Sequence, residues 1–153
     1  MSSLELKVPP LLLFGAVALV MALLARWLPA WDFTLPASSA AAAVLAAAGA
    51  GVAALGARAF VRARTTLDPR LPHKSSSLVR GGVYRASRNP MYLGMLVLLA
   101  AWGLQLGNLA ALLGLPAFVL YMNRFQITPE ERLLGEKFGL EFDQYRAAVR
   151  RWL

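Results

Sequence analysis

The sequence predicts an all-α membrane protein with four transmembrane helices. The last two would form a tight helical hairpin, followed by a C-terminal amphipathic helix on the cytoplasmic surface. Three observations predict this fold class. Of the 153 residues, 58% are hydrophobic, and the mean hydropathy is positive. The hydrophobic residues are gathered into uncharged runs long enough to cross a bilayer. The basic residues gather between those runs, as in cytoplasmic loops.

The composition excludes several classes of function. The chain has no cysteine and a single histidine, His73, so it has no disulfide, no thiolate nucleophile and no cysteine- or histidine-rich metal cluster. We therefore expect no metal site. The net charge of +8 could suggest a nucleic-acid partner, but a soluble basic module would not carry such apolar runs. We expect the partner to be the lipid bilayer and expect no nucleic acid.

The first two spans follow from uncharged runs. Residues 8–25 lie between Lys7 and Arg26, and at 1.5 Å per residue they just cross the roughly 30 Å of hydrocarbon. We predict the first span at about residues 8–28, retained because no small-x-small cleavage site precedes Arg26. The second span is predicted at about 37–61. Its alanines and glycines would let neighbouring helices approach closely.

The segment after the second span is strongly basic. From Arg58 to Arg88 it holds eight basic residues against one acidic residue, Asp68. Such a segment cannot lie in lipid, so residues 62–89 are predicted to form a cytoplasmic loop that fixes the orientation of its neighbours. Attraction to anionic headgroups accounts for most of these charges without any specific site.

The next uncharged run, residues 89–123, is too long for one span, because a single helix would measure about 50 Å. We place its turn at Gly107-Asn108, giving helices at about 90–106 and 109–125. The turn is uncharged and the flanks are basic, so both outer ends should face the cytoplasm. The whole chain, residues 1–153, is then one integral-membrane domain with both termini in the cytoplasm.

The C-terminal region begins with a capping-box pattern. Thr128 would be the N-cap, Pro129 would take the first helical position, and Glu131 would reach back from the third. Apolar residues then recur every three or four positions through residues 129–151. This predicts an amphipathic helix, or a helix pair broken near Gly139, on the cytoplasmic surface.

The start of the third helix resembles an anion site. Asn89 is a good N-cap, and Pro90 fits the first turn because its missing N–H has no partner there anyway. Arg88 is thereby held beside free N–H groups, which suits a carboxylate or phosphate. Any membrane helix entered from the cytoplasm can begin in this way, so the pattern alone does not distinguish an anion site from an ordinary helix start.

A second stretch, which begins just after the uncharged run and includes Glu130 and Glu131, favours a specific site at Arg88 more strongly than the first stretch alone does. Taken together, the two stretches resemble the C-terminal signature of the isoprenylcysteine carboxyl methyltransferase and phospholipid methyltransferase group, over about residues 65–153. The residues that carry the resemblance are Tyr84, Arg88-x-Pro90-x-Tyr92-x-Gly94, Glu130-Glu131-x-x-Leu134-x-x-x-Phe138-Gly139 and Tyr145. The chain departs from many relatives in having Asn89 in place of a histidine and Gln126 in place of an arginine. These departures leave the contacts of both positions, and the choice of acceptor, open.

The resemblance implies S-adenosylmethionine as the cofactor and a small prokaryotic protein of the inner membrane. Topology places the matching residues on one side of that membrane. On physical grounds, Arg88 and the helix N-terminus could bind the cofactor carboxylate, a glutamate could bind its ammonium or ribose, and Tyr92 could face its sulfonium. The implied catalytic residues are Arg88, Tyr92 and Glu130. The implied cofactor-binding residues are Tyr84, Arg88, Asn89, Tyr92, Leu93, Gly94, Glu130 and Glu131.

Two functions remain open at this point. The first is a methyltransferase acting on a lipophilic or small acceptor, which could be a carboxylate, an amine or a thiol. The second is a noncatalytic four-helix scaffold or assembly protein with the same fold. Read singly, the glutamates would be a capped helix start and the tyrosines interfacial aromatics, so only their joint spacing favours the enzyme. Ion transport is poorly supported, because the interiors of the predicted spans hold no ionisable residue. A homodimer is a further candidate assembly.

Overall fold

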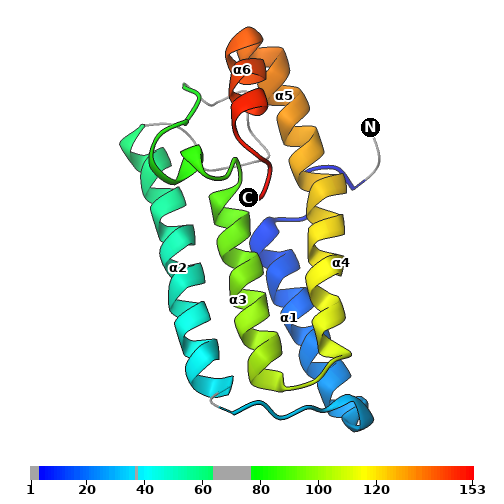
Figure 1. Cartoon of the computed structure of the whole chain (residues 1–153). Helices are drawn as coiled ribbons and strands as arrows, with labels where there is room; N and C mark the ends of the chain where they lie inside the picture. Colours follow the sequence, from blue (N-terminus) through cyan, green and yellow to red (C-terminus); the bar gives the residue numbers. More distant parts are fainter. Residues whose placement is uncertain (1–3, 37, 64–76) are drawn as a thin grey trace.

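The computed structural model describes residues 4–36, 38–63 and 77–153. Within these residues the chain is helical, and its only β pairing is an isolated bridge between Asp32 and Asn108. Four helices, α1 to α4, stand side by side, and α5 and α6 lie beyond one end of this bundle (Figure 1). The prediction of an all-α protein is confirmed.

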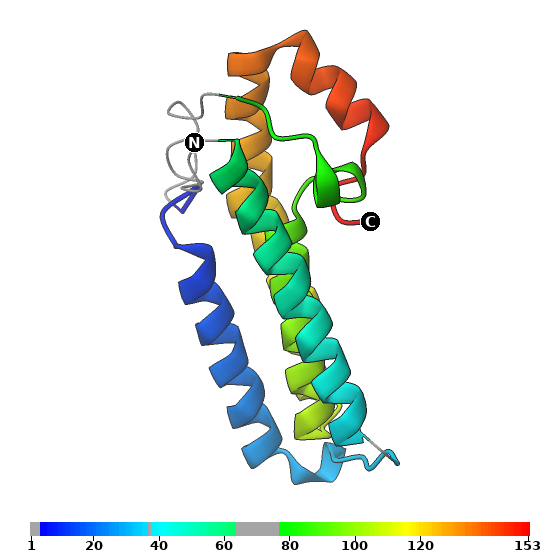
Figure 2. The same ribbon diagram turned by 90° about the vertical axis from the view of Figure 1, so that its left-hand side faces the viewer.

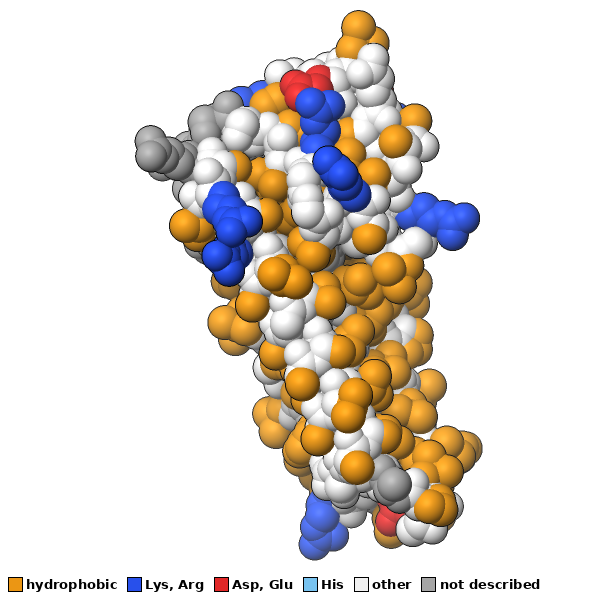
Figure 3. Space-filling view, turned by 60° about the vertical axis from the view of Figure 1, so that its left-hand side comes forward, with side chains coloured by type: hydrophobic (Ala, Val, Ile, Leu, Met, Phe, Trp, Pro, Cys, Tyr) orange, Lys and Arg blue, Asp and Glu red, His pale blue; other side chains and the backbone are white. Residues whose placement is uncertain are grey.

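Helices α1 (Pro10–Trp27) and α2 (Ser38–Arg62) lie within a residue or two of the first two predicted spans. Each is long and apolar enough to cross a membrane, whereas α3 (Pro90–Leu106) is apolar but has 17 residues. Hydrophobic side chains cover the shaft of the molecule, and the charged ones gather at its ends (Figure 3). These features support an integral membrane protein with two candidate spans; the arrangement of four spans stays a prediction.

Helix α3 begins and ends where its sequence signals place it. Pro90 takes the first turn, and Gly107 closes the helix with a φ of 60°, a left-handed conformation that glycine adopts without strain. Asn108 is fully buried; its Nδ2 donates to the carbonyl of Leu28 and to Oδ1 of Asp32, and its Oδ1 accepts from the amide of Ala111. The predicted turn is confirmed, and Asn108 ties it to the connection that follows α1.

Helices α2 and α3 are packed together through glycines. A Cβ added at Gly94 would lie 2.6 Å from the carbonyl oxygen of Gly49 and 2.8 Å from the Cβ of Ala53. A Cβ at Gly56 would lie 2.7 Å from Cγ of Met91. The two backbones therefore approach more closely than larger residues would allow, and α2 runs along α3 for most of its length (Figure 2). On the other side of α3, Met21, Leu99, Ala111, Phe118 and Met122 form the core shared with α1 and α4.

The chain after the hairpin differs from the prediction. A 3₁₀ turn (Ala111–Leu113) leads into α4 (Gly114–Tyr121), a π-helix η5 (Met122–Ile127) and α5 (Thr128–Phe138), without a break between them. Helix α5 begins within a residue of its predicted start, but the break expected between residue 125 and Thr128 is absent. Helix α5 continues the line of α4 away from the bundle (Figure 1).

The capping box is also wrong. Thr128 has helical backbone angles, and its Oγ1 donates to the carbonyl of Asn123 instead of capping a helix. Pro129 normally breaks a helix because it lacks an N–H and its ring collides with the carbonyl four residues earlier. Here the π turn, in which the amide of Thr128 donates to Asn123, five residues earlier, accommodates it. A π-helix is therefore what lets the chain continue through a proline.

The predicted break near Gly139 is confirmed. Helix α5 ends at Phe138, Gly139 has a φ of 51°, and α6 (Leu140–Ala148) runs back from it. Residues 64–76 of the predicted loop at 62–89 are not among the residues that the structure describes. Its described part contains a short 3₁₀ helix, η3 (Gly82–Arg85), just before α3.

Candidate functional site

Four segments meet at the α5 end of the bundle: η3, the start of α3, the first turn of α5 and the residues that follow α6. The structure thereby brings together most of the residues that the sequence singles out. It also divides them into two groups with different chemistry, one around Glu130 and one around Glu131.

Glu130 is held by two donors. The hydroxyl of Tyr92, a side chain only 6% exposed, donates to Oε1 of Glu130 at 2.7 Å. Nε2 of Gln126 donates to the same oxygen, across the one helical turn that separates the two residues. Both hydrogen bonds go to Oε1, so Oε2 accepts none from the described residues. A ligand would therefore meet a carboxylate that is fixed in place but has one oxygen to offer.

Burial changes the ionisation of Glu130. It raises the pKa of this carboxyl to about 7, and the adjacent charge of Glu131 adds to the rise. The hydrogen bonds from Tyr92 and Gln126 act in the opposite direction and limit the shift. Glu130 can therefore take up or release a proton near neutral pH, a range in which an ordinary glutamate is fully ionised.

Glu131 has the opposite character. NH2 of Arg88 lies 2.7 Å from its Oε1, and Arg151 contacts both oxygens, with NH2 2.6 Å from Oε2. Burial would raise the pKa of Glu131, but the hydrogen bonds from Arg151 and Arg88 outweigh it and hold the pKa below its usual value. Glu131 is thus a fixed charge that joins α5 to the start of α3 and to the C-terminal residues.

Most donors of Arg88 form hydrogen bonds within the protein. Its NH1 donates to the carbonyls of Arg146 and Val149, both at 2.8 Å, and its backbone amide donates to Arg150. With NH2 on Glu131, the guanidinium keeps one buried donor, Nε, that has no partner among the described residues. The sequence predicts that Arg88 helps to bind an anion, and Nε is the donor of this side chain that remains for that purpose.

Asn89 sits at the N-cap position, but its side chain does not cap α3. Its Nδ2 donates instead to the carbonyl of Arg151 at 2.9 Å. Ser87, which sequence reasoning missed, accepts the amide of Asn89 at 3.1 Å. The first bond of the helix runs from the amide of Leu93 to the carbonyl of Asn89, so the amides of Met91 and Tyr92 have no acceptor within the helix.

The other predicted residues contribute mainly to packing. Tyr84 is buried, its ring meets that of Phe60 edge-on at 5.5 Å, and its carbonyl accepts the hydroxyl of Tyr145 at 2.8 Å. Burial, followed by the neighbouring Tyr145 and Glu130, raises the pKa of Tyr84 well above its usual value. Gly94 faces α2, as described above, and Leu93 is partly buried beside it.

Sequence reasoning did not include Arg151 in the site. It lies 20 residues from Glu131 in the chain, and no local motif marks it out from the other basic residues near the C-terminus. Gln126 was noticed only as a departure from relatives, and it contacts Glu130 directly. Trp152, next to Arg151, donates to Oδ1 of Asn123 at 3.1 Å and packs against the core.

These residues fit S-adenosylmethionine at the level of donors and acceptors. The buried Nε of Arg88 and the amides of Met91 and Tyr92 suit its carboxylate. Oε2 of Glu130 suits its ammonium or a ribose hydroxyl. Among the described residues, no group of three histidine, aspartate or glutamate side chains could hold a metal ion.

Comparison with known proteins finds a family that this region of the chain matches. Residues 37–141, more than half of the chain, match the family described as phospholipid methyltransferase. The match includes Arg88, Tyr92 and both glutamates, and it ends before Arg151. An uncharacterized protein of Haemophilus influenzae is 52% identical over 63 residues, which are 41% of this chain and the full length of that protein. No solved structure matches the chain.

Proposed function

This chain belongs to the phospholipid methyltransferase family, and from that premise we propose that it is a membrane-embedded, S-adenosylmethionine-dependent methyltransferase. Its acceptor would be a lipophilic or small molecule with a carboxylate, an amine or a thiol, methylated at the cytoplasmic face of a prokaryotic inner membrane. The observation that carries the proposal is the geometry at Glu130, whose Oε1 accepts from Tyr92 and Gln126 and whose Oε2 accepts no hydrogen bond from the described residues. Burial raises the pKa of this carboxyl to about 7.

When bound, S-adenosylmethionine supplies an activated methyl group on a sulfonium. Nε of Arg88 and the first amides of α3 would hold its carboxylate, and Oε2 of Glu130 would accept from its ammonium or ribose. The ring of Tyr92 is buried beside Glu130, where it could face the sulfonium cation. Together these groups would fix the methyl donor against the end of the bundle.

The remaining task is alignment and exclusion of water, because methyl transfer is a displacement that needs no covalent nucleophile. A carboxylate or thiolate acceptor would need no base. An amine must arrive deprotonated, and Glu130 is the group at this site whose pKa lies near neutrality, so it is suited to take that proton. The acceptor class thus decides whether Glu130 only binds or also moves a proton.

The charge distribution supports the proposed orientation. Both ends of the described chain lie at the α5 end: Leu6 donates to the carbonyl of Phe125, and the carbonyl of Arg151 accepts from Asn89. Arg58, Arg62, Arg80, Arg85 and Arg88 belong to this end as well, and a positive excess favours the cytoplasm. Asn89 and Gln126, which depart from many relatives, are the residues that favour the noncatalytic scaffold, whereas the family match favours the enzyme.

A methyl-transfer assay tests the proposal. The detergent-purified protein would be incubated with methyl-labelled S-adenosylmethionine and long-chain carboxylate, amine and thiol acceptors, or with extracted membrane lipids. We expect label in one acceptor class, and we expect Glu130→Gln and Tyr92→Phe to reduce it. Glu136→Gln is the matched control, because Glu136 is an exposed acid on the same helix. Transfer to no acceptor class, by protein shown to be folded, would refute the proposal.

A further inference from the structure

A hollow of about 720 Å³ lies between the last turns of α2 and residues 78–83, the segment that leads into the start of η3. One wall is formed by Leu55, Arg58, Ala59 and Arg62, whose spacing of three and four residues places them on one face of α2. The other wall is residues 78–83. The hollow adjoins the candidate site through η3, but none of the described residues that line it takes part in the hydrogen bonds around Glu130 or Glu131.

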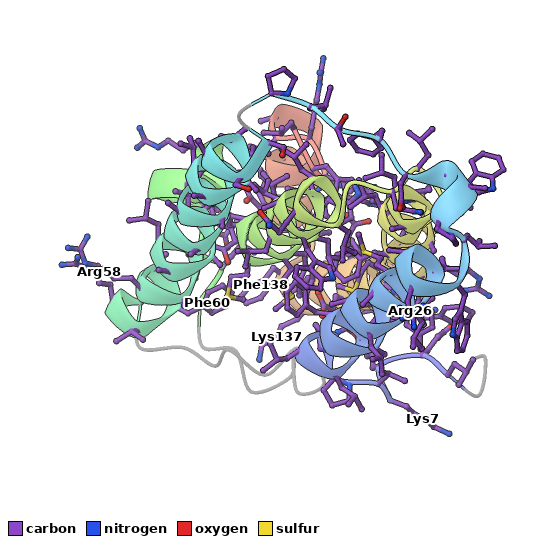
Figure 4. The ribbon with its side chains drawn as sticks, turned by 90° about the horizontal axis from the view of Figure 1, so that it is seen from below. Lys7, Arg26, Arg58, Phe60, Lys137 and Phe138 are labelled. Atoms are coloured by element: carbon purple, nitrogen blue, oxygen red, sulfur yellow. The ribbon has the colours of Figure 1, made fainter. Side chains whose placement is uncertain are left out.

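The lining combines apolar surface with positive charge. Most of its exposed surface is apolar. Among the described residues that line it, the charged ones are three arginines and none is acidic. Arg80 is paired with Glu141 at 2.8 Å, and both side chains are about half exposed. Arg58 and Arg62 make no ion pair with the described residues, and Arg58 extends away from the bundle, whereas Phe60 contacts Tyr84 (Figure 4).

The position of the hollow decides which anion would reach it. Helix α2 is long and apolar enough to cross a membrane, and Arg58 and Arg62 stand at its end with apolar residues below them. Arginines at such a boundary extend to the headgroup layer and attract anionic lipids. A soluble anion would use the charges but would gain nothing from Leu55, Ala59 and Leu78.

We propose that this hollow is a binding site for an anionic membrane lipid, with the headgroup phosphate at Arg58 and Arg62 and part of an acyl chain over Leu55 and Ala59. The site is independent of methyl transfer, since it requires neither the cofactor nor Glu130. The guanidinium groups supply paired donors that match phosphate oxygens, and the bilayer supplies the ligand from the side of α2.

Native mass spectrometry of the detergent-purified full chain tests this site. The protein would be titrated with phosphatidylglycerol, with phosphatidylcholine of the same chain length and with inorganic phosphate. We expect saturable binding of phosphatidylglycerol that exceeds that of phosphatidylcholine by about tenfold, and little effect of free phosphate. The double variant Arg58→Gln, Arg62→Gln should lose that preference. Ala59→Leu, which narrows the hollow and leaves the charge intact, should weaken binding of both lipids.

The matched control is Arg26→Gln, an exposed arginine at the opposite end of the bundle that should bind lipid as the native chain does. Each variant would first be shown to be helical and monodisperse. Equal binding of the two lipids, or equal loss in the Arg26 variant, would overturn the proposal in favour of general surface charge. Two results would overturn the lipid as the occupant. One is displacement of phosphatidylglycerol by inorganic phosphate at comparable concentration, and the other is an Ala59→Leu variant that binds both lipids as the native chain does.

Discussion

The hydroxyl of Tyr92 lies 2.7 Å from Oε1 of Glu130, so a side chain of α3 and a side chain of α5 that are 38 residues apart are joined at one end of the bundle. The adjacent Glu131 points to Arg88 and Arg151 instead. One glutamate of the pair is therefore poised for proton exchange, and the other is locked in an ion-pair cluster. The predictions below depend on this division.

Tyr92→Phe should raise the pKa of Glu130 further, because the hydrogen bond from Tyr92 favours the ionised carboxylate. The lost bond should also cost about 1.5–3 kcal/mol of stability, the range for a hydrogen bond to a charged group. The carboxyl absorption in infrared difference spectra, followed over pH, measures the first effect directly. A pKa that is unchanged or lower in the variant would show that the hydroxyl does not stabilise the charge.

Stability should fall as the pH rises from about 4.5 to about 7, because Glu130 ionises near 4.5 in the unfolded chain but near 7 in the folded one. Over that window the unfolded state releases a proton that the folded state keeps, so the stabilisation, fully present below pH 4.5, is lost. The loss amounts to at most about 3 kcal/mol. Glu131 acts in the opposite sense, since its lowered pKa gives stability that is lost on acidification.

Unfolding temperatures of the detergent-solubilised protein across this pH range measure the effect. Glu130→Gln should flatten the decline, because glutamine does not titrate, whereas Glu136→Gln should leave the profile as it is. A decline of the same size in the Glu130 variant would assign it to another group.

Glu131→Ala should destabilise the fold by about 3–5 kcal/mol, because it leaves the guanidinium of Arg88 charged and buried without its counter-ion. The side chains of Arg88 and Glu131 are only 11% and 12% exposed, so water screens the pair little. Glu141→Ala, which removes the exposed partner of Arg80, should change stability by less than about 1 kcal/mol. Denaturant unfolding of the two variants makes the comparison, and equal effects would contradict the assignment of Glu131 as a buried lock.

Gly94→Ala should separate α2 from α3, since its new Cβ would meet the carbonyl of Gly49 and the side chain of Ala53 at under 3 Å. Overpacking of this kind costs about 1–3 kcal/mol. Gly51→Ala, on the same pair of helices but facing open space, should be neutral or slightly stabilising because alanine favours a helix. Thermal unfolding of the two variants tests the difference. A stable Gly94 variant would mean that the two helices are not in close contact.

Local signals predicted much of this fold. Pro90 and Gly107 mark the ends of α3 correctly, since a proline without an N–H and a glycine with positive φ are both read from a few neighbouring residues. The helix break expected before Pro129 is absent, although a proline judged from its near neighbours usually marks the first turn of a new helix. A π turn admits Pro129 inside a continuous helix, and no short pattern announces that geometry.

The site was less accessible to sequence reasoning. The family resemblance and the predicted topology implied that Tyr92 and Glu130 share a site. No local pattern showed that Glu131 would pair with Arg151 or that Arg88 would bind carbonyls at the end of α6 and after it. Those contacts depend on how the chain turns at Gly139 and on the position of the last residues beside the start of α3. Long-range contacts of basic side chains are set by the packed fold, so Arg151 became visible only in the structure.

Binding of S-adenosylmethionine and of its demethylated product to the purified protein tests the central claim most directly. Titration calorimetry would compare the native chain with Glu130→Gln and with the control Glu136→Gln. We predict saturable binding by the native chain and the control, weakened about tenfold or more in the Glu130 variant, as expected for the loss of a charged hydrogen bond. Absence of binding by folded protein in added lipid, or equal affinity in all three, would contradict the assignment of this site to the cofactor.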